Sequence, residues 1–118
     1  MHELSVAQSI FEIVEQYVPR DQGQSVKSVK LKLGELSGVV PDSLEFCFSA
    51  ITAETPLRGA TLDIEHIPFV LHCRSCDRSF KSELGVVLCP ECGHSDTQVV
   101  SGTEMQVVEI ELYESKLG

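Results

Sequence analysis

The stretch CRSCDRSFKSELGVVLCPEC, residues 73–92, decides how the rest of this chain must be organised. It holds four of the chain's five cysteines, as two C-x2-C pairs separated by twelve residues. Each C-x2-C turn presents two sulfurs together, and two such turns supply the four thiolates that tetrahedral Zn²⁺ takes. Four protein ligands leave no open position on the ion. The sequence therefore predicts a structural zinc site formed by Cys73, Cys76, Cys89 and Cys92.

The residues around these cysteines indicate a small module of their own. From Pro68 to Gly102 the chain has turn residues and little helical periodicity. Gly93 follows the second pair and can adopt the left-handed conformation that such a turn needs. Phe80 and the run Val86–Leu88 are expected to form a small apolar cluster beside the metal. Because so small a core cannot fold alone, zinc would supply the folding free energy.

Two other sites fit the same cysteines, namely a redox dithiol and an iron tetrathiolate; the paired spacing favours zinc over both. His72 and His94 flank the motif, and each is either a substitute ligand or an exposed loop residue. Cys47 lies outside the module on the apolar side of a predicted helix, so we expect a core residue there.

The segments on either side of the module show helical and strand-like patterns. Apolar residues recur at helical spacing from Leu4 to Val18, and Pro19 follows as a terminator. A second helix is predicted to open at Pro41-Asp42-Ser43 and to end before Pro56. Its expected buried stripe is Leu44, Cys47, Phe48 and Ile51.

Three strands are predicted from alternation with a period of two residues. They cover residues 28–33, 60–67 and about 105–113, and a turn bracketed by Gly34 and Gly38 follows the first. The alternation slips at Val107-Val108, which indicates a bulge or burial on both faces. We therefore predict an α+β fold, with two helices packed on a three-stranded sheet. Residues 1–67 and 103–118 would form this domain, and residues 68–102 an inserted zinc-ribbon or rubredoxin-like module.

Composition excludes several classes of function. A net charge of -9 opposes binding to nucleic acid or to an anionic membrane surface. No apolar run reaches the roughly 20 residues of a membrane span, and the N-terminus lacks the pattern of a signal peptide. We therefore expect a cytoplasmic protein. Because the cytosol is reducing, its cysteines serve as metal ligands more often than as disulfides. No nucleophile–base pair, phosphate loop or paired-carboxylate site is evident, so no enzymatic activity is predicted.

The first three residues, Met1-His2-Glu3, form a second candidate metal site. They bring together an imidazole, an α-amine and two backbone amides, and Ni²⁺ favours square-planar nitrogen ligation. The first N–H groups of a helix have no intrahelical partner, so deprotonating those of His2 and Glu3 breaks no helical hydrogen bond.

Chelate geometry predicts an open corner in this nickel site. The His2 amide nitrogen is shared by the chelate rings of the α-amine, the Glu3 amide and the imidazole. A square plane has only two positions adjacent to that nitrogen, so one partner is displaced or unbound. Asp42 is a candidate for the vacant corner; its alternative role is as the cap of the second helix.

Four stretches of this sequence closely resemble the hydrogenase nickel-incorporation protein family, the HypA/HybF-like metallochaperones. They are MHELS at residues 1–5, LGELS at 33–37, LEF at 44–46, and the two C-x2-C pairs. The resemblance covers nearly the whole chain. It implies a nickel domain with an inserted structural zinc domain, nickel bound through His2 and the neighbouring backbone, and zinc held by the four cysteines.

The same resemblance implies a function and partners. A member of this family delivers Ni²⁺ to the [NiFe]-hydrogenase large subunit, works with a nickel-binding GTPase, and in some cases also serves urease. Some relatives carry histidines directly beside the zinc cysteines, where this chain has Asp77 and Gly93. The alternatives are a zinc-ribbon protein-interaction or transcription-related module without nickel transfer, which the negative charge opposes, and a rubredoxin-like iron electron carrier.

Overall fold

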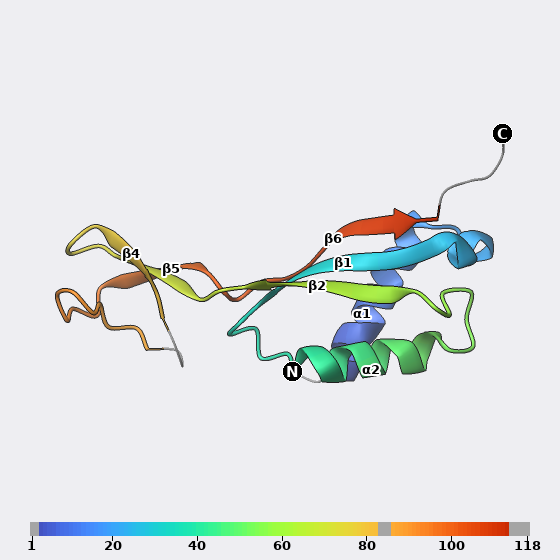
Figure 1. The fold of residues 1–118 in the computed structure, drawn as a ribbon, viewed down its shortest axis with the longest axis horizontal. Helices are drawn as coiled ribbons and strands as arrows, with labels where there is room; N and C mark the ends of the chain where they lie inside the picture. The colour runs from blue at the N-terminus through green and yellow to red at the C-terminus, as the bar shows by residue number, and fades with distance from the viewer. Residues whose placement is uncertain (1–2, 83–85, 114–118) are drawn as a thin grey trace. The chain divides into compact units, whose positions relative to one another are not determined.

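The computed structural model of the chain describes residues 3–82 and 86–113. Its elements, shown in Figure 1, are α1 (Glu3–Tyr17), a 3-10 helix η1 (Arg20–Ser25), β1 (Val26–Gly34), α2 (Pro41–Thr52), β2 (Thr61–Ile67), β3 (Val70–Cys73), β4 (Arg78–Lys81), β5 (Thr97–Ser101) and β6 (Met105–Leu112). The strands form two three-stranded sheets, ordered β2-β1-β6 and β4-β3-β5. The predicted α+β fold with two helices is confirmed.

The chain divides into two compact units. The first, called here the helical unit, comprises Met1–Lys32, Val39–Glu65 and Gln106–Gly118. The second, called the cysteine unit, comprises Leu33–Gly38 and His66–Met105.

The helical unit has its two helices on one face of its sheet (Figure 1). Apolar periodicity explains this arrangement, because the buried side chains of α1 recur every three or four residues and those of β1 every second residue. The fully buried residues of the unit include Ala7, Ile10, Val14, Val29, Leu31, Leu44, Phe48 and Thr52. The hydroxyl of Thr52 donates to the carbonyl of Phe48 at 2.8 Å, so this one polar member is satisfied within its own helix.

Some apolar positions of the predicted helices face solvent instead. Leu4 and Tyr17 at the two ends of α1 are exposed, although helical spacing places them on the apolar side. Both lie where the helix ends, beyond the part of α1 that supplies its buried residues. Cys47 and Ile51 of α2 are half-buried, while Leu44 and Phe48 carry the core contacts.

Strand β1 runs parallel to β2 and antiparallel to β6. The N–H of Glu35 donates to the carbonyl of Ile67, joining the ends of β1 and β2. The N–H of Gly34 bonds to Glu104 and that of Tyr113 to Ser25. Of the two explanations for the slip at Val107-Val108, burial on both faces is wrong, because Val108 is exposed on an edge strand; the bulge stays a prediction.

The start of α2 excludes one of the two roles considered for Asp42, that of the helix cap. The N-cap residue is Val40, with no side-chain cap, and Pro41 occupies the first turn. Pro is favoured there because the missing N–H would have no intrahelical partner. Asp42 lies one residue further on and is exposed, so it does not cap the helix.

The sheet of the cysteine unit is antiparallel throughout. Leu71 of β3 pairs with Phe80 of β4 and with Val99 of β5, and a β-bulge lies between Val70 and Leu71. The buried side chains of the unit include Leu33, Phe69, Leu71, Cys73, Ser82 and Cys89. The expected cluster of Phe80 with residues 86–88 is wrong in part, because Val86, Val87 and Leu88 are all about half exposed. The hydroxyl of Thr97 donates to the carbonyl of Val87, so this segment is anchored through its backbone.

Among the described residues, none of the helices is both long enough and apolar enough to cross a membrane.

Candidate metal centre

The four cysteines of the paired motif converge on one point in the cysteine unit. Their sulfur atoms all lie within 4.8 Å of one another, and no other such group of His, Cys, Asp and Glu occurs among residues 3–82 and 86–113. The Sγ atoms of Cys73 and Cys92 are 3.6 Å apart, as are those of Cys76 and Cys89. Four sulfurs at about 2.3 Å from a tetrahedral Zn²⁺ would be separated by about 3.8 Å. The free thiols therefore have the spacing of a four-thiolate metal site, and are too far apart for disulfides.

Two equivalent turns place the sulfurs. In the first, the N–H of Asp77 donates to the carbonyl of Cys73 at 2.8 Å, and Asp77 has a φ of 58°. In the second, the N–H of Gly93 donates to the carbonyl of Cys89 at 2.8 Å, and Gly93 has a φ of 73°. The left-handed conformation expected at Gly93 is confirmed, and the first turn adopts it with an aspartate.

Backbone amides bring the pKa of one of the four thiols below its ordinary value. The pKa of Cys89 is lowered to about 7, chiefly because the N–H of Cys92 donates to its sulfur, with a further contribution from the N–H of Glu91. Donors aimed at a sulfur favour its thiolate form, which is the form that binds a metal ion.

The pKa values of two other thiols are raised. Desolvation, together with the neighbouring thiols, raises the pKa of Cys76 to about 12. The N–H of His94 lowers the pKa of Cys92, but desolvation and the thiols of Cys73 and Cys89 outweigh it and the net direction is upward. Thiolates this close repel one another, so the thiols tend to keep their protons. A divalent cation in their centre would offset that repulsion.

The two flanking histidines bond to oxygen atoms and are not part of the sulfur cluster. His72 Nδ1 lies 3.0 Å from the Ser79 hydroxyl, and its Nε2 lies 2.9 Å from a carboxylate oxygen of Asp77. His94 Nδ1 lies 2.9 Å from the hydroxyl of Ser75, between the two turns. Within the described part of the cysteine unit, the candidate ligands of this cluster are the four cysteines.

The predicted nickel site falls at the edge of the described chain. Met1 and His2 lie outside the described residues. Glu3 begins α1, and its carboxylate accepts a hydrogen bond from the N–H of Val40 at 3.1 Å. This bond joins the first residue of α1 to the N-cap of α2, next to the turn that carries Asp42. Sequence reasoning missed this bond, because no local pattern links residues 37 positions apart.

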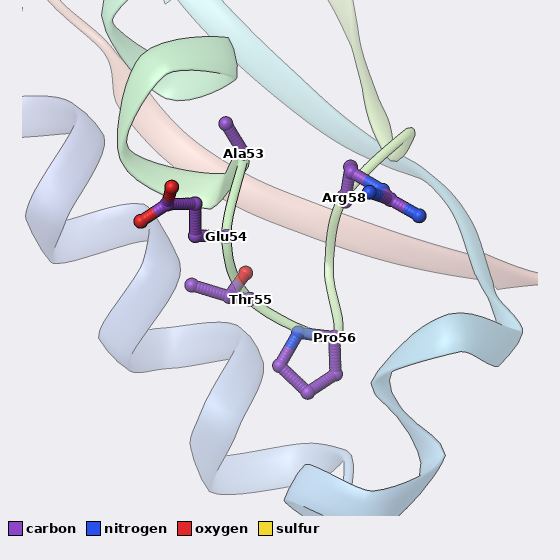
Figure 2. Close-up of a pocket in the computed structure, with 5 residues that line it drawn as sticks. All are labelled: Ala53, Glu54, Thr55, Pro56 and Arg58. Carbon is purple, nitrogen blue, oxygen red and sulfur yellow. The ribbon is translucent and has the colours of Figure 1, made fainter.

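A hollow in the helical unit provides no comparable chemistry. Ala53, Glu54, Thr55, Pro56 and Arg58 line it, all from the loop between α2 and β2. Figure 2 shows Glu54 and Arg58 on opposite arms of this loop. Both are exposed, and the lining contains no cysteine or histidine, so it does not offer a transition-metal site.

The fold and the cysteine cluster together define a small metal-binding protein with a four-thiolate module. Residues 1–112 match the family model "Hydrogenase/urease nickel incorporation, metallochaperone, hypA", and the chain belongs to this family. Because its members are metallochaperones that act as maturation factors, the prediction that the chain is not an enzyme is confirmed.

Individual relatives support the assignment. The hydrogenase maturation factor HypA of Geobacter metallireducens is 46% identical over 112 residues, covering 95% of this chain and 99% of the relative. That of Geotalea uraniireducens is 44% identical with the same coverage. The solution structure of the Ni metallochaperone HypA from Helicobacter pylori has a TM-score of 0.66 at 26% identity, covering 98% of this chain and all of that one.

Proposed function

We propose that this metallochaperone binds Ni²⁺ at its N-terminus and delivers it to the large subunit of a [NiFe] hydrogenase. Membership of the hydrogenase nickel-incorporation family supports the cargo and the client. The observation that carries the site is the hydrogen bond from the Val40 N–H to the Glu3 carboxylate. It holds the start of α1 beside the first turn of α2, so ligands from both helices can serve one ion.

The proposed nickel ligands are nitrogen atoms of the first three residues. They are the Met1 amine, the His2 imidazole and amide, and the Glu3 amide. The carboxylate of Glu3 accepts from the Val40 N–H, and the proposed contribution of Glu3 to the metal is its backbone amide. Asp42 is the candidate for the remaining corner, since it is exposed and does not cap α2. A corner filled by an exchangeable group suits transfer of the ion.

The proposed role of the four-cysteine site is structural. Cys73, Cys76, Cys89 and Cys92 would hold Zn²⁺, which when bound supplies folding free energy to a unit with few buried residues. We propose residues 1–67 and 103–118 as the nickel domain and residues 68–102 as the zinc domain; the compact units differ from these bounds chiefly because Leu33–Gly38 belongs to the cysteine unit.

The proposed partners follow from the family. They are a nickel-binding GTPase accessory protein and the hydrogenase large subunit, and the family description adds urease as a possible second client. We propose that this exchange takes place in the cytoplasm, where a reducing environment keeps the cysteines free as thiols.

Nickel titration of the chain with its native N-terminus tests the nickel site. The comparison includes His2→Ala, a variant with residues added before Met1, and the control His66→Ala, which removes an exposed histidine of β2. We expect His2→Ala to lose the site, with fold and zinc content unchanged, and His66→Ala to bind like the parent. Equal affinity and stoichiometry in all four would exclude an N-terminal site. The extension should change the spectrum if the α-amine is a ligand.

Metal analysis tests the zinc site. We expect one Zn²⁺ per chain, lost in Cys76→Ser and kept in Cys47→Ser, whose cysteine lies outside the cluster. A coloured protein containing iron would identify the rubredoxin-like alternative instead. Full zinc affinity in Cys76→Ser would refute the four-thiolate assignment.

A further inference from the structure

The two C-x2-C turns share a geometry but end on different residues. Asp77 and Gly93 occupy equivalent positions, donate equivalent 2.8 Å hydrogen bonds and have φ values of 58° and 73°. Glycine adopts this left-handed conformation at no steric cost, whereas the Cβ of an aspartate disfavours it. The first turn therefore needs a compensating interaction that the second turn does not.

His72 supplies that interaction from the strand that leads into the turn. Its Nε2 lies 2.9 Å from the Asp77 carboxylate and its Nδ1 lies 3.0 Å from the Ser79 hydroxyl. The carboxylate can only accept, so Nε2–H donates to Asp77, and in the neutral ring Nδ1 then accepts from the Ser79 O–H. His72 and Ser79 are direct partners in the β3–β4 register. The imidazole ring thus bonds to Ser79 of the sheet on one side and to Asp77 of the turn on the other.

The exposed fractions of the two side chains show which of them is packed against the protein. The side chain of His72 is 31% exposed, whereas that of Asp77 is 93% exposed. An aspartate so open to solvent has no packing to keep its backbone left-handed. Beside its backbone bond to Cys73, the bond to the half-buried imidazole is the side-chain contact that restrains it.

We propose that His72 is a positioning residue of the first C-x2-C turn. By holding Asp77 in the left-handed conformation, it fixes the Asp77 N–H on the Cys73 carbonyl and thereby the sulfurs of Cys73 and Cys76. It acts on the metal site without binding the ion, because both ring nitrogens are already bonded to oxygen atoms. This inference rests on the zinc site proposed above.

The test measures how fast the zinc-loaded full chain releases Zn²⁺ to excess EDTA. The variants are His72→Ala, Asp77→Gly, the double variant, and His94→Ala as a control that removes a histidine bond to Ser75 of the same turn without affecting a left-handed residue. Removing an outer partner of a metal ligand typically weakens a site by about 10- to 100-fold. We expect release from His72→Ala to be about tenfold faster than from the parent, with Asp77→Gly and His94→Ala near the parent rate.

The double variant separates positioning from other roles. If His72 serves to hold Asp77 left-handed, a glycine at position 77 makes it dispensable, and the double variant should release zinc at the rate of Asp77→Gly. Release as fast as from His72→Ala would overturn the proposal. So would a parent-like rate in His72→Ala, or equal acceleration in His94→Ala.

Cobalt substitution adds a readout of the ligand set. We expect the thiolate-to-Co²⁺ absorption bands to be unchanged in His72→Ala, since four sulfurs remain. A shifted spectrum would make His72 a ligand and overturn the positioning role. Zinc content of the parent is measured first: a parent without zinc would refute the four-thiolate site itself, whereas one Zn²⁺ per chain with unaffected variants would refute only the role of His72.

Discussion

The backbones of Gly34 and Gly102 pack directly against each other in the cysteine unit. A Cβ atom on Gly34 would overlap the carbonyl group of Gly102. Beside this contact, the N–H of Leu36 donates to the Gly102 carbonyl at 2.7 Å, and that of Gly34 donates to the Glu104 carbonyl at 2.8 Å. Gly102, with a φ of 111°, lies in turn against Phe69. Segment Leu33–Gly38 is thereby built into the unit that carries the cysteines.

Replacing Gly34 with alanine should therefore destabilise the cysteine unit. The overlap is with backbone atoms, which cannot move aside as a side chain can, so we expect a loss of about 3 kcal/mol. The matched control is Gly59→Ala, where the Cβ meets open space and only the left-handed φ of 91° is unfavourable, costing about 1 kcal/mol. Urea denaturation of the zinc-loaded chain measures both. Equal losses would contradict the close approach.

Two phenylalanines two positions apart in α2 should respond very differently to truncation. Phe48 is 1% exposed and Phe46 is 75% exposed. Phe48→Ala removes a core ring and should cost about 3–5 kcal/mol of unfolding free energy. Phe46→Ala should change it by no more than about 0.5 kcal/mol. Denaturation followed by far-ultraviolet circular dichroism distinguishes them, and a large loss in Phe46→Ala would contradict the orientation of the helix.

Asp42→Ala should weaken nickel binding while leaving the fold nearly unchanged. Because Asp42 makes no cap bond, its removal costs only its favourable charge near the start of α2, about 0.5 kcal/mol. Nickel titration and thermal denaturation are measured on the same sample. Unchanged nickel affinity would remove Asp42 from the site, and a stability loss typical of a lost helix cap would reinstate its capping role.

Zinc affinity should rise with pH. In the metal-free chain the raised pKa values of Cys76, at about 12, and Cys92 keep both thiols protonated near neutrality, so Zn²⁺ must displace at least these two protons. Two displaced protons correspond to about 100-fold in affinity per pH unit, which is the smallest slope expected. Below about pH 7, Cys89 adds a further proton because its pKa is about 7. Competition with a chelator between about pH 6 and pH 8 measures the slope; Cys47→Ser should show the same slope, and a flat profile would contradict these pKa directions.

Much of the fold and of the candidate zinc site could be predicted because the signals are local. The four cysteines lie in two short turns, and their spacing alone indicates the cluster that the structure confirms. The helices and strands follow from apolar periodicity, which one segment carries by itself. The errors fall where burial depends on distant neighbours. Leu4 and Tyr17 lie on the apolar side of α1 but near its two ends, beyond the residues of the helix that are buried.

What the sequence by itself determined is the two helices, the three strands of the helical unit and the four clustered cysteines, since each depends on residues close together in the chain. Only the tertiary structure decided three contacts. They are the packing of Gly34 on Gly102, the hydrogen bond between Glu3 and Val40, and the hydrogen bond between His72 and Asp77. The first two join segments far apart in sequence, and their partners include backbone atoms that every residue possesses. The third depends on a left-handed aspartate that no spacing rule predicts. Such contacts exist only once the chain has folded, and for that reason the sequence carries no separate sign of them.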